Sequence, residues 1–494
     1  MTWEAVVLWF QQGILVYFAL LNLLYALFGY LGIRSVIVYA RGVSRVALRD
    51  LLELEFYKPV SILVPAHNEE GSIVASVRSM LGLHHPEFEV VVAQDGSTDR
   101  TLEALVEAFS LVEVPLVYRK AIDTKPVRRI LRSVRYPNLI VVDKENGGKS
   151  DAVNAALNVA RYPLVCAVDA DSLLNAEALL RASRAFVEDD RVVAVGGTVR
   201  PLNGAVLREG TVRELRVPKR WLERFQILEY ARGFFTGRAA WSKFGALLII
   251  SGAFGVFRRD VLLEAGGMWT GTVTEDMEIV VRLHRMSFGK RRPYRVLFTP
   301  DPICWTEVPS DLGTLRRQRN RWHRGLWETL WRHRGMLLRP RYGSVGLVGL
   351  PYFWLFEGIG PVVEMLGYVT LVASIATGSV FAEFAVPFLI LSVLFGMLLS
   401  QLAVGIETML LARYERLSDR FRLFAACFLE MFGYRQLMTW ERFIATFQVR
   451  RKRHTWGAMK RAGIPAGDWS GSRVPGAEPE PEPAPESRSE ARPL

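Results

Sequence analysis

Apolar residues gather along this chain in two patterns: long runs that are almost free of charge, and short runs that alternate with polar segments. Residues 6–40 carry a single charged side chain, Arg34. Since about 20 apolar residues are enough for a helix to cross a membrane, this run predicts a transmembrane helix. A cleaved signal peptide is the alternative, but the run is too long for one and no basic segment precedes it. We therefore expect a retained anchor, with further spans within 343–375 and 384–411.

The short apolar runs lie in the middle of the chain, between about residues 58 and 299. Expected strands are 59–66, 88–95, 138–143 and 163–171, and expected helices are 69–81, 97–109 and 147–160. Alternation of this kind predicts an α/β domain, Rossmann-like, with a mainly parallel sheet covered by helices. Ligands of such sheets bind beyond the carboxyl ends of the strands. Asp95, Asp143 and Asp169 lie at such ends and are expected to approach one crevice.

The charges that flank the first apolar run predict its orientation. Glu4 is the only charged residue before the run, whereas Arg34, Arg41, Arg45 and Arg49 lie at or after its end. Positive charge concentrates on the cytoplasmic side of membrane proteins. We therefore expect a multi-pass protein of the inner (plasma) membrane, with the N-terminus outside and the α/β domain in the cytoplasm.

The net charge of +12 would suit a nucleic-acid partner, but the distribution of that charge favours another. The densest basic segment, residues 316–341, also contains Trp322, Trp327 and Trp331. Arginine and tryptophan together at a membrane boundary are typical of an interfacial helix that faces anionic lipid. We expect membrane lipids or a phosphorylated substrate as partners, with no nucleic acid, and we expect Arg332 to face the lipid.

These patterns divide the chain into six parts. They are the anchor at 1–48, the α/β domain at 58–311, an amphipathic interfacial region at 312–341, two spans at 342–412, an interfacial or re-entrant hairpin with a basic segment at 413–462, and a disordered Pro/Glu-rich tail at 463–494. Two acids, Glu357 and Glu364, fall within the second span. They are expected to face a bundle interior or an aqueous path, or to make a hydrogen bond that packs two helices together.

The apolar strand at 163–171 ends in Asp169-Ala170-Asp171. One interpretation is a turn, because aspartate favours strand exits. The other is a cation site, because carboxylates suit Mg²⁺ or Mn²⁺, and magnesium typically takes only one or two protein carboxylates beside substrate phosphates. The motif alone favours the turn, so its surroundings decide.

Five further motifs surround this pair in order. They are "PAHNEE" at 65–70, "QDGSTD" at 94–99, "NGGKSDAVNAAL" at 146–157, "TED" at 274–276 and "QRNRW" at 318–322. Glycines and Lys149 ahead of a helix can hold a phosphate, and Gln318, Arg321 and Trp322 fall on one helical face. Each motif alone also fits a turn, a surface charge, a helix start or a lipid contact.

Taken together, the D, D-x-D, T-E-D and Q-x-x-R-W set between membrane segments resembles the membrane-bound processive family-2 glycosyltransferases, such as cellulose, chitin, hyaluronan and poly-N-acetylglucosamine synthases. The resemblance covers about residues 58–341 and the flanking membrane helices. It implies a GT-A fold, a UDP-sugar donor, Mg²⁺ or Mn²⁺, and inversion at the anomeric carbon to give β-linkages.

The resemblance also implies roles for individual positions. Ala66, Glu69 and Asp95 should contact uridine, and Lys149 should lie near the nucleotide. Asp169 and Asp171 should hold the metal and the diphosphate, and Asp276 should be the general base, with Glu275 beside it raising its pKa. Ser251 belongs to an acceptor-side segment, and Gln318, Arg321 and Trp322 should close over the diphosphate and the acceptor end.

The implied function is polymerisation of a UDP-sugar, with UDP-N-acetylglucosamine as the first candidate, onto a growing polysaccharide that is exported with the help of partner subunits. One alternative is a single sugar transfer to a lipid carrier, although such enzymes generally lack Q-x-x-R-W. Another is a transporter or membrane scaffold without catalysis, against which the intact acids argue.

Overall fold

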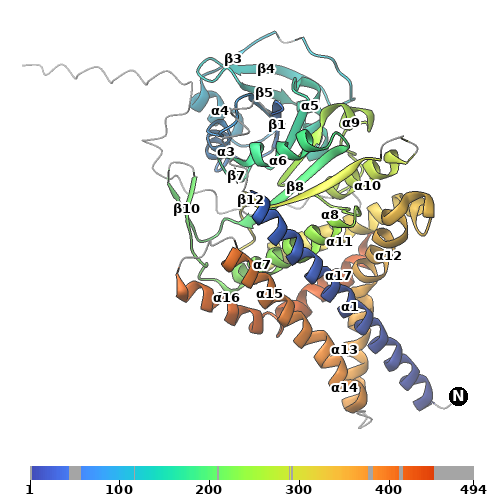
Figure 1. The fold of residues 1–494 in the computed structure, drawn as a ribbon. Helices are drawn as coiled ribbons and strands as arrows, with labels where there is room; N and C mark the ends of the chain where they lie inside the picture. Colours follow the sequence, from blue (N-terminus) through green and yellow to red (C-terminus); the bar gives the residue numbers. More distant parts are fainter. Residues whose placement is uncertain are drawn as a thin grey trace, which may run out of the picture.

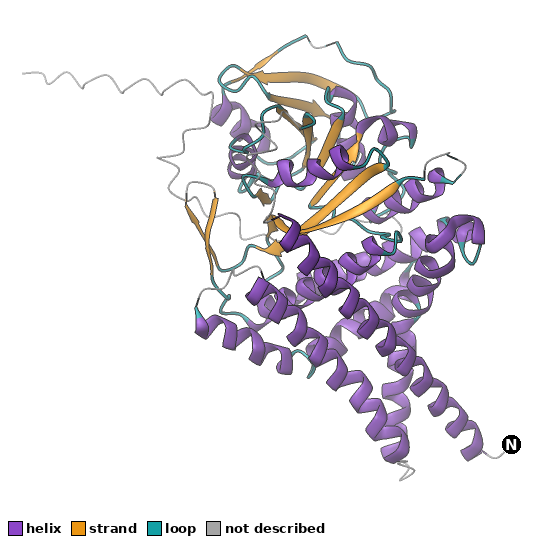
Figure 2. Ribbon diagram, in the orientation of Figure 1, coloured by secondary structure: helices purple, strands orange, loops and turns teal. Residues whose placement is uncertain are grey.

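The structure is a computed structural model, and it describes residues 3–43, 57–115, 117–208, 211–288, 290, 293–376, 382–410 and 416–449. An α/β domain occupies one half of the molecule, and a bundle of long helices extends from it (Figure 1). Strands are confined to the α/β half, whereas the other half is helical (Figure 2). The predicted tail at 463–494 lies outside the described residues.

Four parallel strands form the centre of the sheet, in the order β5 (Leu139–Lys144), β2 (Phe88–Asp95), β1 (Val60–Ala66) and β6 (Leu164–Val168). These are the four strands that the sequence predicts. Their side chains are buried almost throughout, as expected for continuous Val/Ile/Leu runs covered on both faces. The parallel pairing brings the polar residues that follow each strand to one edge of the sheet.

Further strands extend this centre on both sides, and because β4, β11 and β7 run antiparallel to their neighbours the sheet is mixed. On one side lie β4 (Val127–Ser133) and β3 (Leu111–Glu113); on the other lie β11 (Phe254–Arg258), β8 (Val192–Pro201), β12 (Arg295–Thr306) and β7 (Ser172–Leu174). β4 pairs antiparallel with β5 and occupies part of the 119–138 segment, to which the sequence pattern assigns no element. A separate hairpin joins β9 (Ala205–Arg208) and β10 (Thr211–Leu215).

Helices of the α/β domain connect the strands and place polar residues at the sheet edge. They are α3 (Ile73–Leu81), α4 (Thr101–Phe109), α5 (Lys149–Val159), α6 (Ala178–Glu188), α9 (Arg259–Glu264) and α10 (Glu275–Ser287). α5 begins at Lys149, and α10 begins at Glu275 and Asp276. Two of the charged motifs therefore stand at helix starts, where helical geometry fixes their direction.

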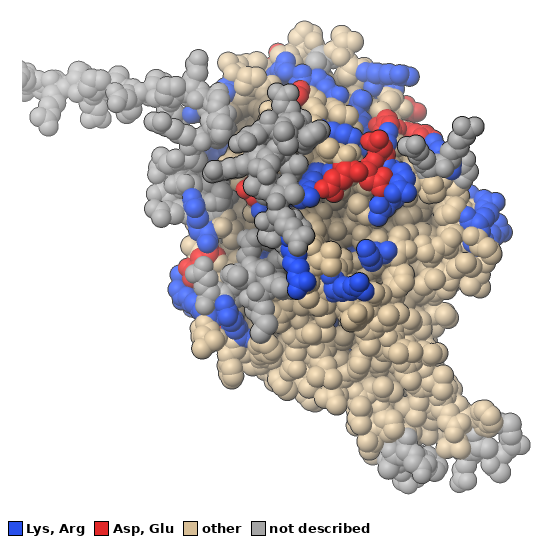
Figure 3. Space-filling model, in the orientation of Figure 1, with Lys and Arg blue, Asp and Glu red and all other residues tan. Residues whose placement is uncertain are grey.

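Three helical segments are long and apolar enough to cross a membrane: 7–39, 345–376 and 384–406. The first lies in α1 (Trp3–Val43). The second begins with two π-helical turns (Val345–Gly349 and Phe353–Gly358) around α12 (Leu350–Tyr352) and ends in α13 (Gly360–Ala376); the third runs through α14 (Ala382–Leu389), a π-helical turn (Ile390–Leu394) and α15 (Phe395–Leu410). The visible surface over these helices carries few charged side chains (Figure 3), which fits contact with lipid.

A second set of helices lies between the sheet and the spans. It comprises α7 (Trp221–Ala231), a π-helical segment at Arg232–Arg238, α8 (Ala239–Lys243), α11 (Leu312–Arg332), α16 (Leu417–Leu429) and α17 (Tyr434–Gln448). Gly32 of α1 lies against the π-helical segment so closely that an added Cβ would stand 2.3 Å from the Phe235 carbonyl oxygen. This contact fixes the first span against the α/β domain.

α16 and α17 form a helix pair in the region where the sequence predicts an interfacial or re-entrant hairpin. α17 packs against α11 through ion-pair and hydrogen-bond contacts, of which Arg316 to Glu441 is 2.5 Å and His323 to Thr446 is 2.9 Å. Phe421 and Phe432 remain exposed on the pair, which is the pattern of helices that lie at a membrane surface.

The acids of the second span pair with arginines of α17. The Glu357 carboxylate lies 2.8 Å from Arg442, and the Glu364 carboxylate lies 3.9 Å from Arg435 and accepts a hydrogen bond from Tyr368. Both acids also line a cavity that runs between the helices. Glu357 and Glu364 therefore both face the interior of the helix bundle and make contacts that pack its helices together.

Candidate active site

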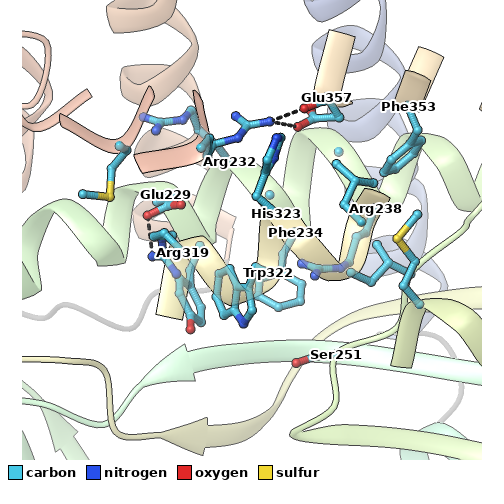
Figure 4. Close-up of a pocket in the computed structure, with 18 of the residues that line it drawn as sticks. Glu229, Arg232, Phe234, Arg238, Ser251, Arg319, Trp322, His323, Phe353 and Glu357 are labelled. Atoms are coloured by element: carbon cyan, nitrogen blue, oxygen red, sulfur yellow. Dashed lines mark hydrogen bonds and ion pairs between the residues drawn. The ribbon is translucent and has the colours of Figure 1, made fainter. Parts of the chain in front are cut away.

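A cavity of about 640 Å³ opens between the sheet edge, α11 and the membrane helices. From the α/β domain its lining includes Lys149, Asp169, Asp171, Ser251, Glu275 and Asp276; α11 adds Gln318, Arg321 and Trp322; the membrane side adds Tyr17, Asn22, Glu357, Gly360, Leu399 and Arg442. Trp322 and Arg238 lie between Ser251 on the sheet side and Glu357 on the membrane side (Figure 4). One hollow thus joins the charged sheet edge to the spans.

Lys149 holds two acids from different elements together. Its ammonium lies 2.7 Å from the Asp169 carboxylate, which follows β6, and 2.8 Å from the Glu275 carboxylate, which begins α10. Burial alone would lower the pKa of Lys149, but the two carboxylates outweigh burial and raise it. Burial alone would likewise raise the pKa of Glu275, and the Lys149 ammonium holds it below its ordinary value instead. Lys149 therefore stays charged and Glu275 ionised near neutral pH.

Asp276 has the opposite character from its neighbour. One carboxylate oxygen accepts a hydrogen bond from the Gly252 N–H at 3.0 Å, and the other accepts one from the Met277 N–H at 2.9 Å. Burial, and then the negative charge of Glu275, raise the pKa of Asp276 to about 6. The sequence predicts this rise in pKa, because Glu275 stands directly beside Asp276. A carboxylate with such a pKa is ionised at neutral pH and is a better proton acceptor than an ordinary aspartate.

Asp169 and Asp171 suit a divalent cation bound together with a phosphorylated ligand. Burial, and then the charge of Asp169, raise the pKa of Asp171 to about 7, so the two carboxylates repel each other in a place where a cation would compensate both. Among the described residues, His, Cys, Asp and Glu side chains form no cluster of three or more that could hold a metal ion. Two carboxylates without a larger cage are what magnesium uses when phosphates complete its coordination.

α11 brings Gln318, Arg321 and Trp322 to the cavity on one face, as the i, i+3, i+4 spacing predicts. Burial lowers the pKa of Arg321, while the charges of Glu275, Asp169 and Asp276 favour its protonated form. Arg321 therefore supplies positive charge beside the acids. The exposed Trp322 ring stacks on the Arg319 guanidinium at 4.2 Å.

Arg319 and Glu229 are site residues that the sequence motifs do not reveal. Arg319 pairs with the Glu229 carboxylate at 2.7 Å, and the Tyr434 hydroxyl donates to the same carboxylate at 2.9 Å. This trio ties α7, α11 and α17 together under Trp322. Arg319 stands inside the "QRNRW" motif, but its partner lies on a helix without any motif, so spacing could not find the pair.

Gly252 and Arg238 are two further residues of the cavity without an earlier assignment. Gly252 donates its N–H to Asp276, and an added Cβ would stand 3.0 Å from the Lys149 ammonium and 3.4 Å from the Asp276 carboxylate. Arg238 lies over the Phe234 ring at 4.1 Å, and burial lowers its pKa while Asp276 favours its charge. Gly252 belongs to the "SGAFGVFRR" segment, which is a signal in the sequence, whereas Arg238 lies in none of the motifs.

The predicted uridine-binding residues lie at the neighbouring strand ends and do not line the 640 Å³ cavity. The Asp95 carboxylate accepts hydrogen bonds from the N–H groups of Gly147 and Gly148 and from Lys144. It thereby fixes the glycine turn that leads into Lys149. Ala66 is buried at the end of β1, and Glu69 accepts a hydrogen bond from Ser72. Their contact with uridine stays a prediction.

The expectation that Arg332 faces lipid is wrong. Its guanidinium lies 3.2 Å from the Glu278 carboxylate and 3.7 Å from the centre of the Trp269 ring. Glu278 also accepts from Arg282 at 2.8 Å and lies 3.2 Å from His333. Helical spacing places Arg332 near the membrane, but a buried acid on α10 takes it as a partner.

Comparison with known proteins places this fold and site in a class. Residues 58–325 match the family described as "Glycosyltransferase like family 2". The sheet, its D-x-D strand end and the covering helices define a GT-A glycosyltransferase fold. The chain belongs to glycosyltransferase family 2.

Curated relatives and a solved structure show what the chain is similar to. The chain is 27% identical over 304 residues to a poly-β-1,6-N-acetyl-D-glucosamine synthase of Staphylococcus epidermidis, and 27% identical over 303 residues to the synthase of the same name from Staphylococcus aureus. Each match covers 61% of this chain and 61% of the relative. A mannosyltransferase from Pyrobaculum calidifontis, solved with GDP-Man and Mn²⁺, is 20% identical with a TM-score of 0.48, covering 83% of this chain and 99% of that one.

The close approach of Gly252 to the charged centre gives a prediction. Gly252→Ala inserts a methyl group between Lys149 and Asp276, which must shift one of them by a few tenths of an ångström or more. Because small misplacements of reacting groups are costly, sugar transfer should fall by about tenfold to a hundredfold. The measurement is nucleotide release from the sugar donor, with thermal unfolding of the same sample to show that the variant is folded.

Gly71→Ala is the matched control, because no atom lies within 4 Å of the added Cβ at that position. Its rate should equal that of the unaltered protein. Equal rates for both variants would show that the Gly252 contact has no part in the reaction.

Proposed function

We propose that this protein transfers a sugar from a UDP-sugar to the end of a growing β-linked polysaccharide at the cytoplasmic face of the inner membrane. The observation that carries the proposal is the single cavity. In it an ionised carboxylate, a pair of carboxylates suited to a cation, and the Gln318–Arg321–Trp322 face of α11 meet at the mouth of a passage between membrane helices.

The acids divide the chemistry between them. Asp276 takes the proton from the acceptor hydroxyl as that oxygen attacks the anomeric carbon; its hydrogen bonds to Gly252 and Met277 fix its direction. The bond from the anomeric carbon to the diphosphate breaks in the same step, so the configuration inverts without a covalent enzyme intermediate. Arg321 stabilises the negative charge that develops on the departing diphosphate. Glu275 is kept ionised by its ion pair with Lys149, and its negative charge helps to raise the pKa of Asp276.

Asp169 and Asp171 would hold Mg²⁺ or Mn²⁺, which neutralises diphosphate charge when it is bound. The protein contributes the positions of the two carboxylates: Asp169 is fixed by Lys149, and Asp171 is buried immediately before β7. Asp95 acts at a distance by holding the glycine turn that precedes Lys149. Ala66 and Glu69, on the neighbouring strand end, complete the proposed uridine site.

UDP-N-acetylglucosamine is the proposed donor, supported by the similarity to poly-β-1,6-N-acetyl-D-glucosamine synthases. Processive elongation is supported by the continuity of the cavity from Asp276 past Trp322 to Tyr17, Asn22 and Leu399. A growing chain can remain in such a passage while its end returns to the base. We propose that it leaves the cytoplasm by this route, with partner subunits assisting export.

Donor choice and product length test this proposal directly. Purified protein incubated with a panel of UDP-sugars and Mg²⁺ or Mn²⁺ should release UDP fastest from UDP-N-acetylglucosamine and should yield long chains. EDTA should stop release, and added metal should restore it. Full release in EDTA would remove the cation from the proposal, and a product of one sugar on a lipid would replace polymerisation by single transfer.

The roles of the acids separate in two isosteric variants. Asp276→Asn keeps the shape of the side chain but cannot take a proton, so turnover should fall by about a hundredfold to ten-thousandfold with little change in UDP-sugar affinity. Asp169→Asn should instead weaken metal-dependent binding of the donor. Calorimetric affinity beside UDP release distinguishes them. If Asp276→Asn turns over normally, or loses donor binding as severely as Asp169→Asn, the base has been wrongly assigned.

The raised pKa of Asp276 predicts the pH dependence. The base works only when it is ionised, so the rate should rise with pH through about 6 and stay level above neutral. Below that pKa it should fall by about tenfold for each pH unit, because the ionised fraction does so. An ordinary aspartate would give no change between pH 5 and 8. The pH profile of UDP release at saturating donor checks this, and the residual rate of Asp276→Asn should lack the step.

A further inference from the structure

A second hollow, of about 320 Å³, lies away from the catalytic cavity, where the end of α11 meets the end of α10. Its lining includes Arg285, His333, Arg334, Arg339, Arg341 and Tyr342. Arg332 lines the hollow as well, but Glu278 holds it in an ion pair. The other four arginines extend from two separate segments, α10 and the stretch after α11, and each has an exposed side chain. Cations converge on this hollow from two sides, which a single basic helix face cannot achieve.

Within the described part of the chain, no carboxylate lies in salt-bridge distance of Arg285, Arg334, Arg339 or Arg341. Arg334 donates to the Trp331 carbonyl, and Arg341 donates to the Tyr342 hydroxyl and lies over its ring at 4.6 Å. By contrast Arg332, on the same stretch, is held by Glu278. Glu278 thus compensates part of the charge of the hollow, whereas Arg285, Arg334, Arg339 and Arg341 have no acidic partner among the residues that the structure describes.

Buried, closely packed residues form the floor of the hollow. His333, Met336 and Tyr342 beneath the arginines are almost completely buried. Tyr342 packs edge-on against Phe288 at the end of α10, with ring centres 5.0 Å apart. The Arg339 carbonyl lies so near Gly346 that an added Cβ there would stand 2.7 Å from it. The loop that carries Arg339 and Arg341 is thus packed between α10 and the start of the second span.

The position of the hollow indicates where its ligand comes from. The second candidate span begins at Val345, directly after the arginine-bearing loop. Leu347 and Val348, on the first turn of that span, are exposed. A ligand with a phosphate in the hollow and an apolar part beside these residues would satisfy both surfaces. Basic pockets beside membrane helices on the cytoplasmic side bind anionic headgroups in this way.

We infer that this hollow is a binding site for a phosphate group, supplied by an anionic phospholipid of the surrounding leaflet. Guanidinium groups suit phosphate oxygens because their N–H donors form paired hydrogen bonds. The same chemistry would accept a soluble phosphate, which the test must distinguish. The site is separate from the sugar-transferring cavity, so the inference stands or falls independently of the proposed function.

The test measures lipid binding by the full chain in neutral detergent, using native mass spectrometry and thermal unfolding. The probes are phosphatidylglycerol, phosphatidylcholine and inorganic phosphate. We expect saturable binding of phosphatidylglycerol and little of phosphatidylcholine. Arg285→Gln with Arg339→Gln should weaken that binding by about tenfold to thirtyfold, because each interfacial cation contributes on the order of 1 kcal/mol.

Lys219→Gln with Lys243→Gln is the matched control, because it also removes two exposed cations, away from the hollow. It should bind phosphatidylglycerol like the unaltered protein. Equal losses in the two double variants, or no loss in either, would overturn the inference by showing that the charge acts diffusely or not at all.

Inorganic phosphate identifies the source of the ligand. Competition by millimolar phosphate, lost in the Arg285/Arg339 variant alone, would support the anion site and overturn its assignment to lipid. Should that double variant fail to fold, Arg339→Gln alone gives the same comparison, with an expected loss of about fivefold; unchanged binding in this folded variant would also overturn the inference.

Discussion

The two ion pairs of Lys149 are the interaction on which the site depends. They join α5 and the end of β6, which are consecutive in the chain, to the start of α10, which lies far from both in sequence. Removing one partner of a largely buried ion pair typically costs about 3–5 kcal/mol, because the remaining charge is left uncompensated. Lys149 therefore does more than carry a charge into the cavity. It sets the distance between the carboxylates that suit a cation and the carboxylate that suits a proton.

The contrast between Glu275 and Asp276 follows from this arrangement. The Lys149 ammonium, 2.8 Å away, keeps Glu275 ionised, and the negative charge of Glu275 acts on Asp276. Asp276 receives backbone N–H groups but no ion pair in the described part of the chain, and its pKa rises. Burial raises the pKa of both acids, and the Lys149 ion pair reverses this effect for Glu275 alone. One carboxylate is thus held by a cation, while the other is the better proton acceptor of the two.

α11 connects this chemistry to the membrane. One face presents Arg321 and Trp322 to the cavity, while Arg332 at its end binds Glu278 on α10. Arg316 binds Glu441 on α17, which in turn holds Glu357 of the second span through Arg442. These pairs connect α11 with α17 and with the second span. The charged residues of the sheet edge and the passage between the spans therefore line one cavity.

Much of this molecule is determined by local sequence. The parallel strands follow from continuous buried runs, the spans follow from length and hydropathy, and the i, i+3, i+4 spacing puts Gln318, Arg321 and Trp322 on one face. These features depend on the local spacing and composition of residues, which can be read directly from the sequence. The order of the acidic motifs likewise points to one sheet edge, because parallel strands end together.

Tertiary structure alone decided the partners of the charges. Arg332 was expected to face lipid, yet it binds Glu278, and Arg319 finds Glu229 on a helix that bears no motif. The 119–138 segment has no strong period, and only its middle part forms β4 (Val127–Ser133), which pairs with the edge of β5. A charged side chain takes its partner from whatever the fold brings near it. The sequence by itself therefore determined the elements and the residues that reach the site, whereas the pairing that gives each carboxylate its pKa arose only when distant segments packed together.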